Sequence, residues 1–213
     1  MNKRLFLIGA RLFFAALNVA AIITQLTYSS QYSISFSLTN FFSFFTILTN
    51  TLAAIYFTRI TFSRDDKTGT VNKPGALTAI TVYIFMVGSV YQVVLRRIWK
   101  PAGLQLIVDE LLHSVIPVSV IIFWALYENK KAVGYRQIPK WAIYPLAYLV
   151  YILIRGSFSD FYPYPFVNVG EIGMAKTILN SAVLVLVFFL VAALFVFIGK
   201  YFSKNQQPAS SSQ

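Results

Sequence analysis

Residues 175–201 read AKTILNSAVLVLVFFLVAALFVFIGKY, with no charged side chain between Lys176 and Lys200. A helix needs roughly 20 mostly apolar residues to cross the hydrocarbon core of a bilayer, so this stretch predicts a transmembrane helix. Five further apolar stretches precede it, at residues 5–28, 39–62, 75–95, 107–126 and 140–156. The sequence therefore predicts an all-α membrane protein, a polytopic bundle of six transmembrane helices.

The composition agrees with a protein whose solvent is lipid. Hydrophobic residues make up 57% of the 213 residues and charged residues 12%, whereas soluble domains average about 45–50% and about 25%. A soluble enzyme of this size could not bury so much apolar surface. The absence of cysteine and the single histidine also exclude thiolate and multi-histidine metal sites, and we expect no metal or cofactor.

The chain is predicted to form one domain. Short loops join the apolar stretches, so residues 1–203 are expected to form a single bundle, followed by a low-complexity, disordered cytoplasmic tail at 204–213. The first stretch follows Lys3 and Arg4 as a signal peptide would. It is too long for a signal-peptide core and lacks a small-residue cleavage site, so we expect a retained helix.

The positive charges are distributed unevenly between the two sides of the predicted bundle. If the N-terminus is cytoplasmic, 13 of the 18 Lys and Arg residues fall on the inner side and 5 on the outer side. This asymmetry predicts both termini inside, at the cell membrane. The net charge of +11 is then explained by orientation and by attraction to anionic membrane lipids, and we expect no nucleic-acid partner.

Polar side chains form one stripe on the second predicted helix, at spacings i, i+4, i+7 and i+11: Thr39, Ser43, Thr46 and Asn50. The residues between them are expected to face lipid: Phe41, Phe44, Phe45 and Leu48. Such hydroxyls commonly bond to their own helix or join helices. A stripe of four that ends in an amide also fits a functional site, because polar groups are costly in hydrocarbon.

The only histidine, His113, lies on the fourth predicted helix, three and four residues after Glu110 and Asp109. Either carboxylate could orient the imidazole as a base, or the three could form a solvated helix end. At 1.5 Å per residue, Thr46 lies roughly 10 Å and His113 roughly 9 Å below the same outer surface. They are therefore a candidate nucleophile and base within direct or one-water reach.

The fifth predicted helix carries an aromatic stripe that ends in a cation: Trp141, Tyr144, Tyr148, Tyr151 and Arg155. Such stripes are usually bundle core or interfacial belts. Arg96 and Arg97 are expected at the same outer mouth, where three guanidiniums could bind a ligand carboxylate or a lipid phosphate. Candidate substrate-binding residues are Arg96, Arg97, Arg155, Tyr148 and Tyr151. The aromatic loop 157–173 is expected to cap this mouth.

Three short motifs make the sequence similar to a known family. They are Asn40-Phe41-Phe42-Ser43-Phe44-Phe45-Thr46-Ile47, Leu112-His113-Ser114-Val115-Ile116-Pro117 and Tyr164-Pro165-Phe166, the last preceded by Tyr144 to Tyr151. In order and spacing they resemble the androgen-induced-gene family of multi-pass membrane threonine hydrolases, in its prokaryote-type branch.

The resemblance implies a hydrolase that cleaves fatty acid esters of hydroxy fatty acids with one intramembrane Thr and one intramembrane His. The matching positions are Thr46 as nucleophile and His113 as base, with Thr49 and Thr51 as neighbouring candidates. Asn50, one turn from Thr46, is expected as an oxyanion donor. The expected partners are membrane lipids and a fatty-acyl ester substrate.

Two other function classes fit parts of the sequence. Pro117 and Pro145 interrupt predicted helices, as in small transporters, but no inverted repeat and no midplane carboxylate accompany them. A non-catalytic membrane protein is the third possibility. The hydrolase interpretation is preferred because it explains both the pairing of Thr46 with His113 and the family resemblance.

Overall fold

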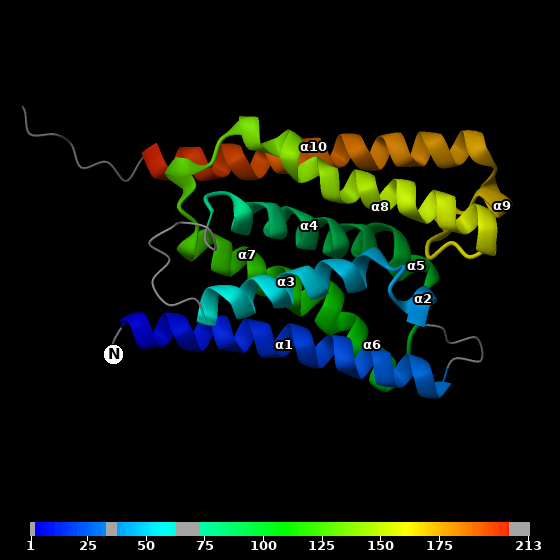
Figure 1. The fold of residues 1–213 in the computed structure, drawn as a ribbon, viewed down its shortest axis with the longest axis horizontal. Helices are drawn as coiled ribbons and strands as arrows, with labels where there is room; N and C mark the ends of the chain where they lie inside the picture. Colours follow the sequence, from blue (N-terminus) through cyan, green and yellow to red (C-terminus); the bar gives the residue numbers. More distant parts are fainter. Residues whose placement is uncertain (1–2, 33–37, 63–72, 205–213) are drawn as a thin grey trace, which may run out of the picture.

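The computed structural model describes residues 3–32, 38–62 and 73–204. Within these ranges all regular secondary structure is helical, and no strand occurs. The long helices run back and forth along the long axis of the molecule (Figure 1). They are α1 (Lys3–Tyr32), α3 (Phe45–Phe62), α4 (Ala76–Val90), α6 (Leu104–Glu110) with α7 (Ile116–Tyr127), α8 (Ile138–Ser159) and α10 (Met174–Lys204).

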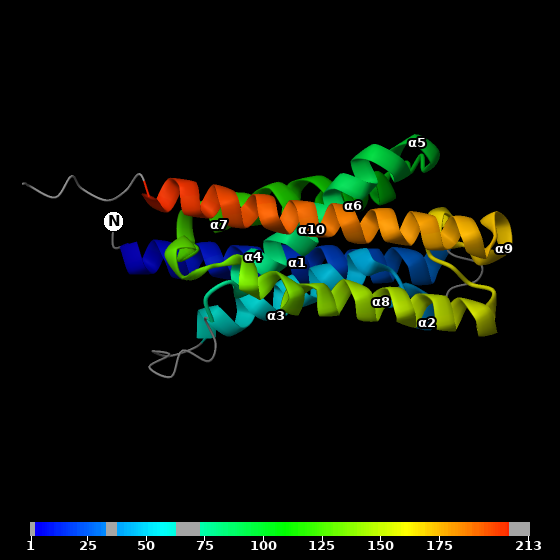
Figure 2. The ribbon, with the colours of Figure 1, turned by 90° about the horizontal axis from the view of Figure 1, so that it is seen from above.

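Short helical turns connect these helices. They are α2 (Leu38–Phe41), α5 (Arg96–Ile98), α9 (Val169–Ile172), two π-helical turns at Tyr91–Leu95 and Leu111–Val115, and three 3₁₀ turns at Lys130–Ala132, Tyr135–Gln137 and Pro165–Val167. Helices α1 and α3 lie side by side, as do α8 and α10 (Figures 1 and 2). The tail predicted to be disordered lies outside the described residues, apart from Lys204, which ends α10.

Five of the six predicted spans are helices long and apolar enough to cross a membrane, which indicates a membrane protein. They cover Ile8–Ser30, Ala76–Ile98, Leu104–Tyr127, Tyr135–Ser159 and Met174–Ser203. The stretch predicted at 39–62 is not among them. The chain leaves helical geometry between α2 and α3, and the helix that follows is not apolar enough. The remaining 18 residues of α3 include several Thr residues, Asn50 and Arg59, which lower its hydropathy.

Helix α4 is the central helix of the bundle. It packs against α3, α7, α8 and α10 and is apolar on all sides, as expected of a helix without a solvent face. Its two buried threonines both have hydrogen-bond partners. Thr81 donates to the Leu77 carbonyl, and Thr78 bonds to Glu128 and accepts from the Trp124 indole. The core of the bundle is therefore formed around α4.

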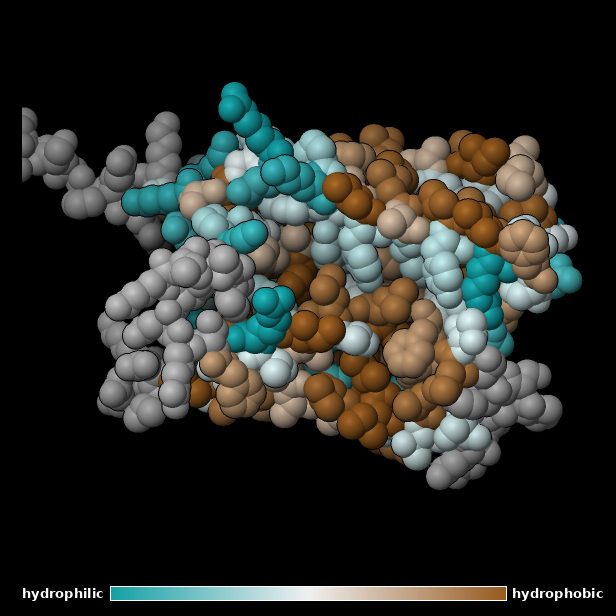
Figure 3. Space-filling view, viewed as in Figure 1, coloured by the Kyte–Doolittle hydropathy of each residue, from teal (hydrophilic) through white to brown (hydrophobic). Residues whose placement is uncertain are grey.

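The outer surface is largely apolar along the helices and charged at their ends. Phe62 and Phe158 are 72% and 87% exposed, which lipid explains better than water. Figure 3 shows hydrophobic side chains over much of one face, with most hydrophilic ones toward the left end. That end holds the start of α1 and the end of α10 (Figure 1).

Candidate active site

Thr46 lies in the first turn of α3 with its side chain 8% exposed. Its hydroxyl oxygen Oγ1 is 3.2 Å from Nε2 of His113, which lies in the π-helical turn Leu111–Val115. The two residues suggested by depth counting are thus in direct hydrogen-bond contact. The alternative threonines have other partners: Thr49 contacts the Tyr144 hydroxyl at 3.0 Å, and Thr51 donates to the Ile47 carbonyl.

The second ring nitrogen of His113 fixes the tautomer. Nδ1 is 2.9 Å from the backbone carbonyl oxygen of Asp109, and a carbonyl oxygen can only accept a hydrogen bond. Nδ1 therefore carries the proton, and Nε2 offers a lone pair to the Thr46 hydroxyl. The Tyr91 ring stacks on the imidazole, with centroids 4.0 Å apart and planes 12° apart, so its orientation is fixed from the side as well.

The π-helical turn around His113 has a local cause. Pro117 lacks an N–H, so the carbonyl of His113 has no normal i+4 donor, and the helix widens to a turn in which the Ile116 N–H bonds to Leu111. Helix α4 approaches this turn through Gly88. A Cβ at Gly88 would lie 3.0 Å from the His113 carbonyl oxygen and 3.2 Å from Pro117 Cβ. Widened π-helical turns of this kind are frequent at functional sites.

The carboxylates expected to orient the imidazole do not contact it. The Asp109 carboxylate accepts hydrogen bonds from Trp99 Nε1 at 2.6 Å and Gln105 Nε2 at 3.0 Å. Glu110 forms an ion pair with Arg96 and accepts from Ser114. These donors lie closer to each carboxylate than the imidazole does, so Asp109 positions the ring through its backbone carbonyl instead.

Asn50 does not point its amide donor at the site. Its Nδ2 donates to the Thr46 carbonyl at 2.8 Å within α3, so the side chain supports the helix turn that carries Thr46. Phe41, expected to face lipid, is 5% exposed and belongs to the core, because α2 and the following turn fold the chain inward. The polar stripe is thus interrupted ahead of Thr46.

Tyr164 is a neighbour of Thr46 that was absent from the predicted site residues. It lies in the loop between α8 and α9, where its ring is parallel to Phe166, with centroids 5.2 Å apart. The Thr46 backbone N–H donates to its hydroxyl at 3.4 Å. Burial raises the pKa of the Tyr164 hydroxyl, which therefore keeps its proton. The repeated Tyr-Pro pairs at 162–165 are the sequence feature that could have indicated a role for Tyr164.

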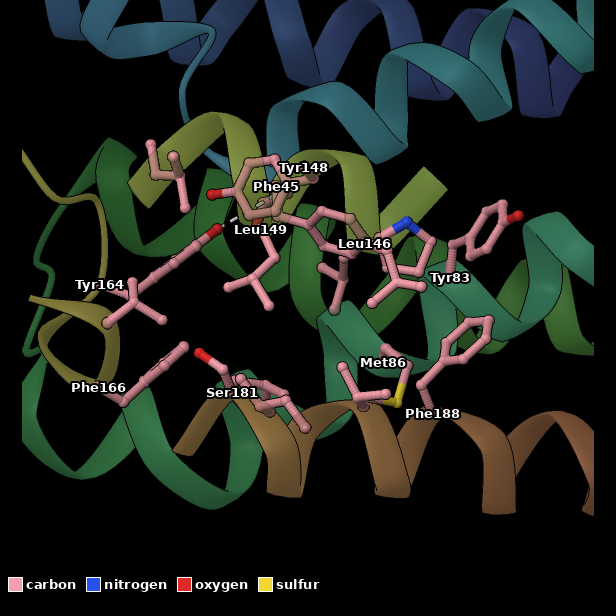
Figure 4. A pocket seen from close by; sticks show the side chains of 18 of the residues that line it. Phe45, Tyr83, Met86, Leu146, Tyr148, Leu149, Tyr164, Phe166, Ser181 and Phe188 are labelled. Atoms are coloured by element: carbon pink, nitrogen blue, oxygen red, sulfur yellow. Dashed lines mark hydrogen bonds between the residues drawn. The ribbon is translucent and has the colours of Figure 1, made fainter. Parts of the chain in front are cut away.

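Two cavities meet at Thr46 and Tyr164, which line both. The larger, which we call the vestibule, has a volume of about 860 Å³ and polar groups in its wall, among them Gln105, Asp109 and His113. Loop residues Phe161 and Pro163 also line it, as expected of a cap. The smaller, the apolar cavity, has a volume of about 120 Å³ and lies between α4, α8 and α10 (Figure 4).

The predicted substrate-binding residues are spread around this centre. Tyr148 lines the apolar cavity and donates to the Ser43 carbonyl at 2.8 Å, and Tyr151 contacts the Ser43 hydroxyl at 3.2 Å. Arg155 donates to the Asn40 side chain, which lines the vestibule. Arg96 is paired with Glu110, and Arg97 is exposed. None of these three arginines lines either cavity as the described residues form it.

Comparisons with protein-family models, with curated proteins and with solved structures each found no match for this chain. The chemical interpretation of the site therefore rests on its geometry.

Proposed function

We propose that the protein is an intramembrane hydrolase of fatty-acyl esters, with Thr46 as nucleophile and His113 as general base. The observation that carries this proposal is the contact between Thr46 Oγ1 and the unprotonated Nε2 of His113. A threonine hydroxyl is a weak nucleophile unless a base takes its proton. A base held in the required tautomer by a third group is the arrangement that such catalysis uses.

In the proposed acylation step, Thr46 Oγ1 bonds to the ester carbonyl carbon as its proton moves to His113 Nε2. The tetrahedral adduct then loses the alcohol, which takes the proton from Nε2. In deacylation a water from the vestibule gives its proton to Nε2 and attacks the acyl-threonine. Release of the fatty acid returns the proton to Thr46, so the enzyme ends as it began.

Two groups support the negative oxygen of the adduct. The first turn of a helix has N–H groups without intrahelical acceptors and a partial positive charge, and Thr46 occupies that turn of α3. The Tyr164 hydroxyl accepts from the Thr46 N–H, and in this proposal it donates its own proton to the oxyanion. This assignment replaces the oxyanion role expected for Asn50.

The proposal includes the orientation of the bundle in the cell membrane. In this orientation α3 also crosses the membrane, in addition to the five apolar helices, and both termini are cytoplasmic. Two features support this: α1 begins and α10 ends at the same end of the molecule (Figure 1), and by sequence most Lys and Arg residues fall on the cytoplasmic side in this orientation. Thr46 then lies toward the outer leaflet, where ester lipids reach the vestibule.

The direct test is hydrolysis of a model fatty-acyl ester by the purified protein in detergent. Wild-type protein and the Thr49→Ala variant should release fatty acid at similar rates. In Thr46→Ala and His113→Ala the rate of release should fall by on the order of 10³-fold or more. Thr49 is the matched control, because it is buried on the same helix but contacts Tyr144. Equal activity in all four proteins would overturn the proposal.

A further inference from the structure

The apolar cavity between α4, α8 and α10 contains one polar group without a partner. Ser181 lines this cavity, is 7% exposed, and its hydroxyl has no hydrogen-bond partner among the described residues. Such groups are rare in protein interiors, because a buried hydroxyl without a partner loses its hydrogen bonds to water and gains none in return.

The other hydroxyls in the cavity wall are all satisfied by the protein. Tyr83 donates to the Trp141 carbonyl at 2.7 Å, and Tyr148 donates to the Ser43 carbonyl. Thr46 and Tyr164 have the contacts already described. Thr46 and Tyr164 act on the ester group in the proposed reaction, so the Ser181 hydroxyl is the only polar side-chain group in the described wall that is left to bind the rest of the substrate chain.

The direction of the Ser181 side chain is also unusual for this helix. Serine and threonine in helices commonly donate to the carbonyl four residues earlier, and on α10 both Thr177 and Ser203 do so. Ser181 does not, and Figure 4 shows its hydroxyl pointing into the cavity, on the side of Tyr164 and Phe166. The helix thus presents this hydroxyl to the space inside.

We propose that this cavity binds the hydrocarbon chain of the substrate and that Ser181 hydrogen-bonds an oxygen carried on that chain. The preferred acyl group is therefore an oxygenated fatty acyl chain. The remaining wall is formed by aliphatic and aromatic side chains such as Met86, Leu184 and Val185, which suit methylene groups. Thr46, whose hydroxyl attacks the scissile carbonyl in the proposed reaction, also lines this cavity.

This inference rests on the proposed ester hydrolysis, but its test does not require turnover. Stearic acid and a positional series of monohydroxystearic acids compete with a fluorescent fatty acid for wild-type protein in detergent. At least one hydroxylated isomer should bind about 2- to 10-fold more tightly than stearic acid, as one net hydrogen bond predicts. Ser181→Ala should abolish that preference, and the control Ser203→Ala should retain it.

The location of the site is tested by a matched pair on α10. Val185 lines the cavity, whereas Val183 does not line it and is 50% exposed. Val185→Phe should weaken binding of all the fatty acids, and Val183→Phe should leave it unchanged. Equal effects of the two variants, or a preference that survives Ser181→Ala, would overturn the inference. If hydrolysis fails but the binding pattern holds, the chain site stands without the hydrolase.

Discussion

Thr46 Oγ1 and His113 Nε2 lie 3.2 Å apart although 67 positions of sequence separate the two residues. Each lies where a regular helix is disturbed: Thr46 where α3 begins after a turn, and His113 in a π-helical turn caused by Pro117. The contact depends on both irregularities, since each directs a polar side chain into the bundle.

The backbone carbonyl of Asp109, rather than its carboxylate, orients His113. Asp109→Asn should therefore keep kcat within about 10-fold of wild type, because the carbonyl is unchanged and the amide can still accept from Trp99. Kinetics on a model ester would check this. A loss as large as that of His113→Ala would mean that the carboxylate charge itself supports the imidazolium formed during the reaction.

The Tyr164 hydroxyl is the proposed oxyanion donor. Tyr164→Phe should lower kcat by roughly 10²–10³-fold with little change in KM, the usual effect of removing one such donor. The ring can keep its stacking on Phe166, so the fold should be retained. Tyr162→Phe, in the same loop, is the control and should have wild-type kcat. Unchanged turnover in Tyr164→Phe would remove this residue from the mechanism.

Gly88 allows α4 to approach the turn that carries His113. Gly88→Ala should destabilise the protein by about 1–3 kcal/mol, the usual cost of overpacking, and should lower activity by displacing His113. Gly9→Ala is the matched control, because a Cβ at Gly9 meets nothing within 4 Å. Thermal unfolding in detergent compares the two. A Gly88→Ala protein as stable and active as Gly9→Ala would contradict the close approach.

The proposed orientation can be mapped with single cysteines, because the native chain has none. Ser159 and Lys131 are exposed at opposite ends of α8, the first at its C-terminal end and the second in the loop before it. A membrane-impermeant thiol reagent applied to intact cells should label Ser159→Cys and leave Lys131→Cys unlabelled. The reverse pattern would place the vestibule on the cytoplasmic side.

The sequence predicted the helical content, because hydropathy indicates which segments can cross a membrane, and it also predicted that Thr46 meets His113, although the depth of Thr46 was counted along a helix that is broken ahead of α3. It did not predict the break before α3, since the Phe-rich segment remains apolar whether it is helical or turned. The group that orients the His113 imidazole also differs from the predicted carboxylate. Both carboxylates satisfy the spacing rule, but Trp99, Gln105 and Arg96 bind them, and spacing alone does not show which of several neighbouring groups a carboxylate contacts.

Tyr164 illustrates a second limit of local patterns. Its loop is far from Thr46 in sequence. The Tyr164 hydroxyl reaches the Thr46 N–H only because the chain folds the loop against the start of α3. The sequence predicted that this loop caps the outer mouth, whereas its contact with Thr46 depends on tertiary structure.

If Thr46 is a nucleophile activated by His113, it should react covalently with an electrophilic probe. Purified protein is treated with a fluorophosphonate probe, and the modified peptide is identified by mass spectrometry. We expect one adduct, on Thr46, that is absent in Thr46→Ala and strongly reduced in His113→Ala but retained in Thr49→Ala. A wild-type protein that stays unlabelled while hydrolysing esters, or an adduct on another residue that persists in Thr46→Ala, would contradict it.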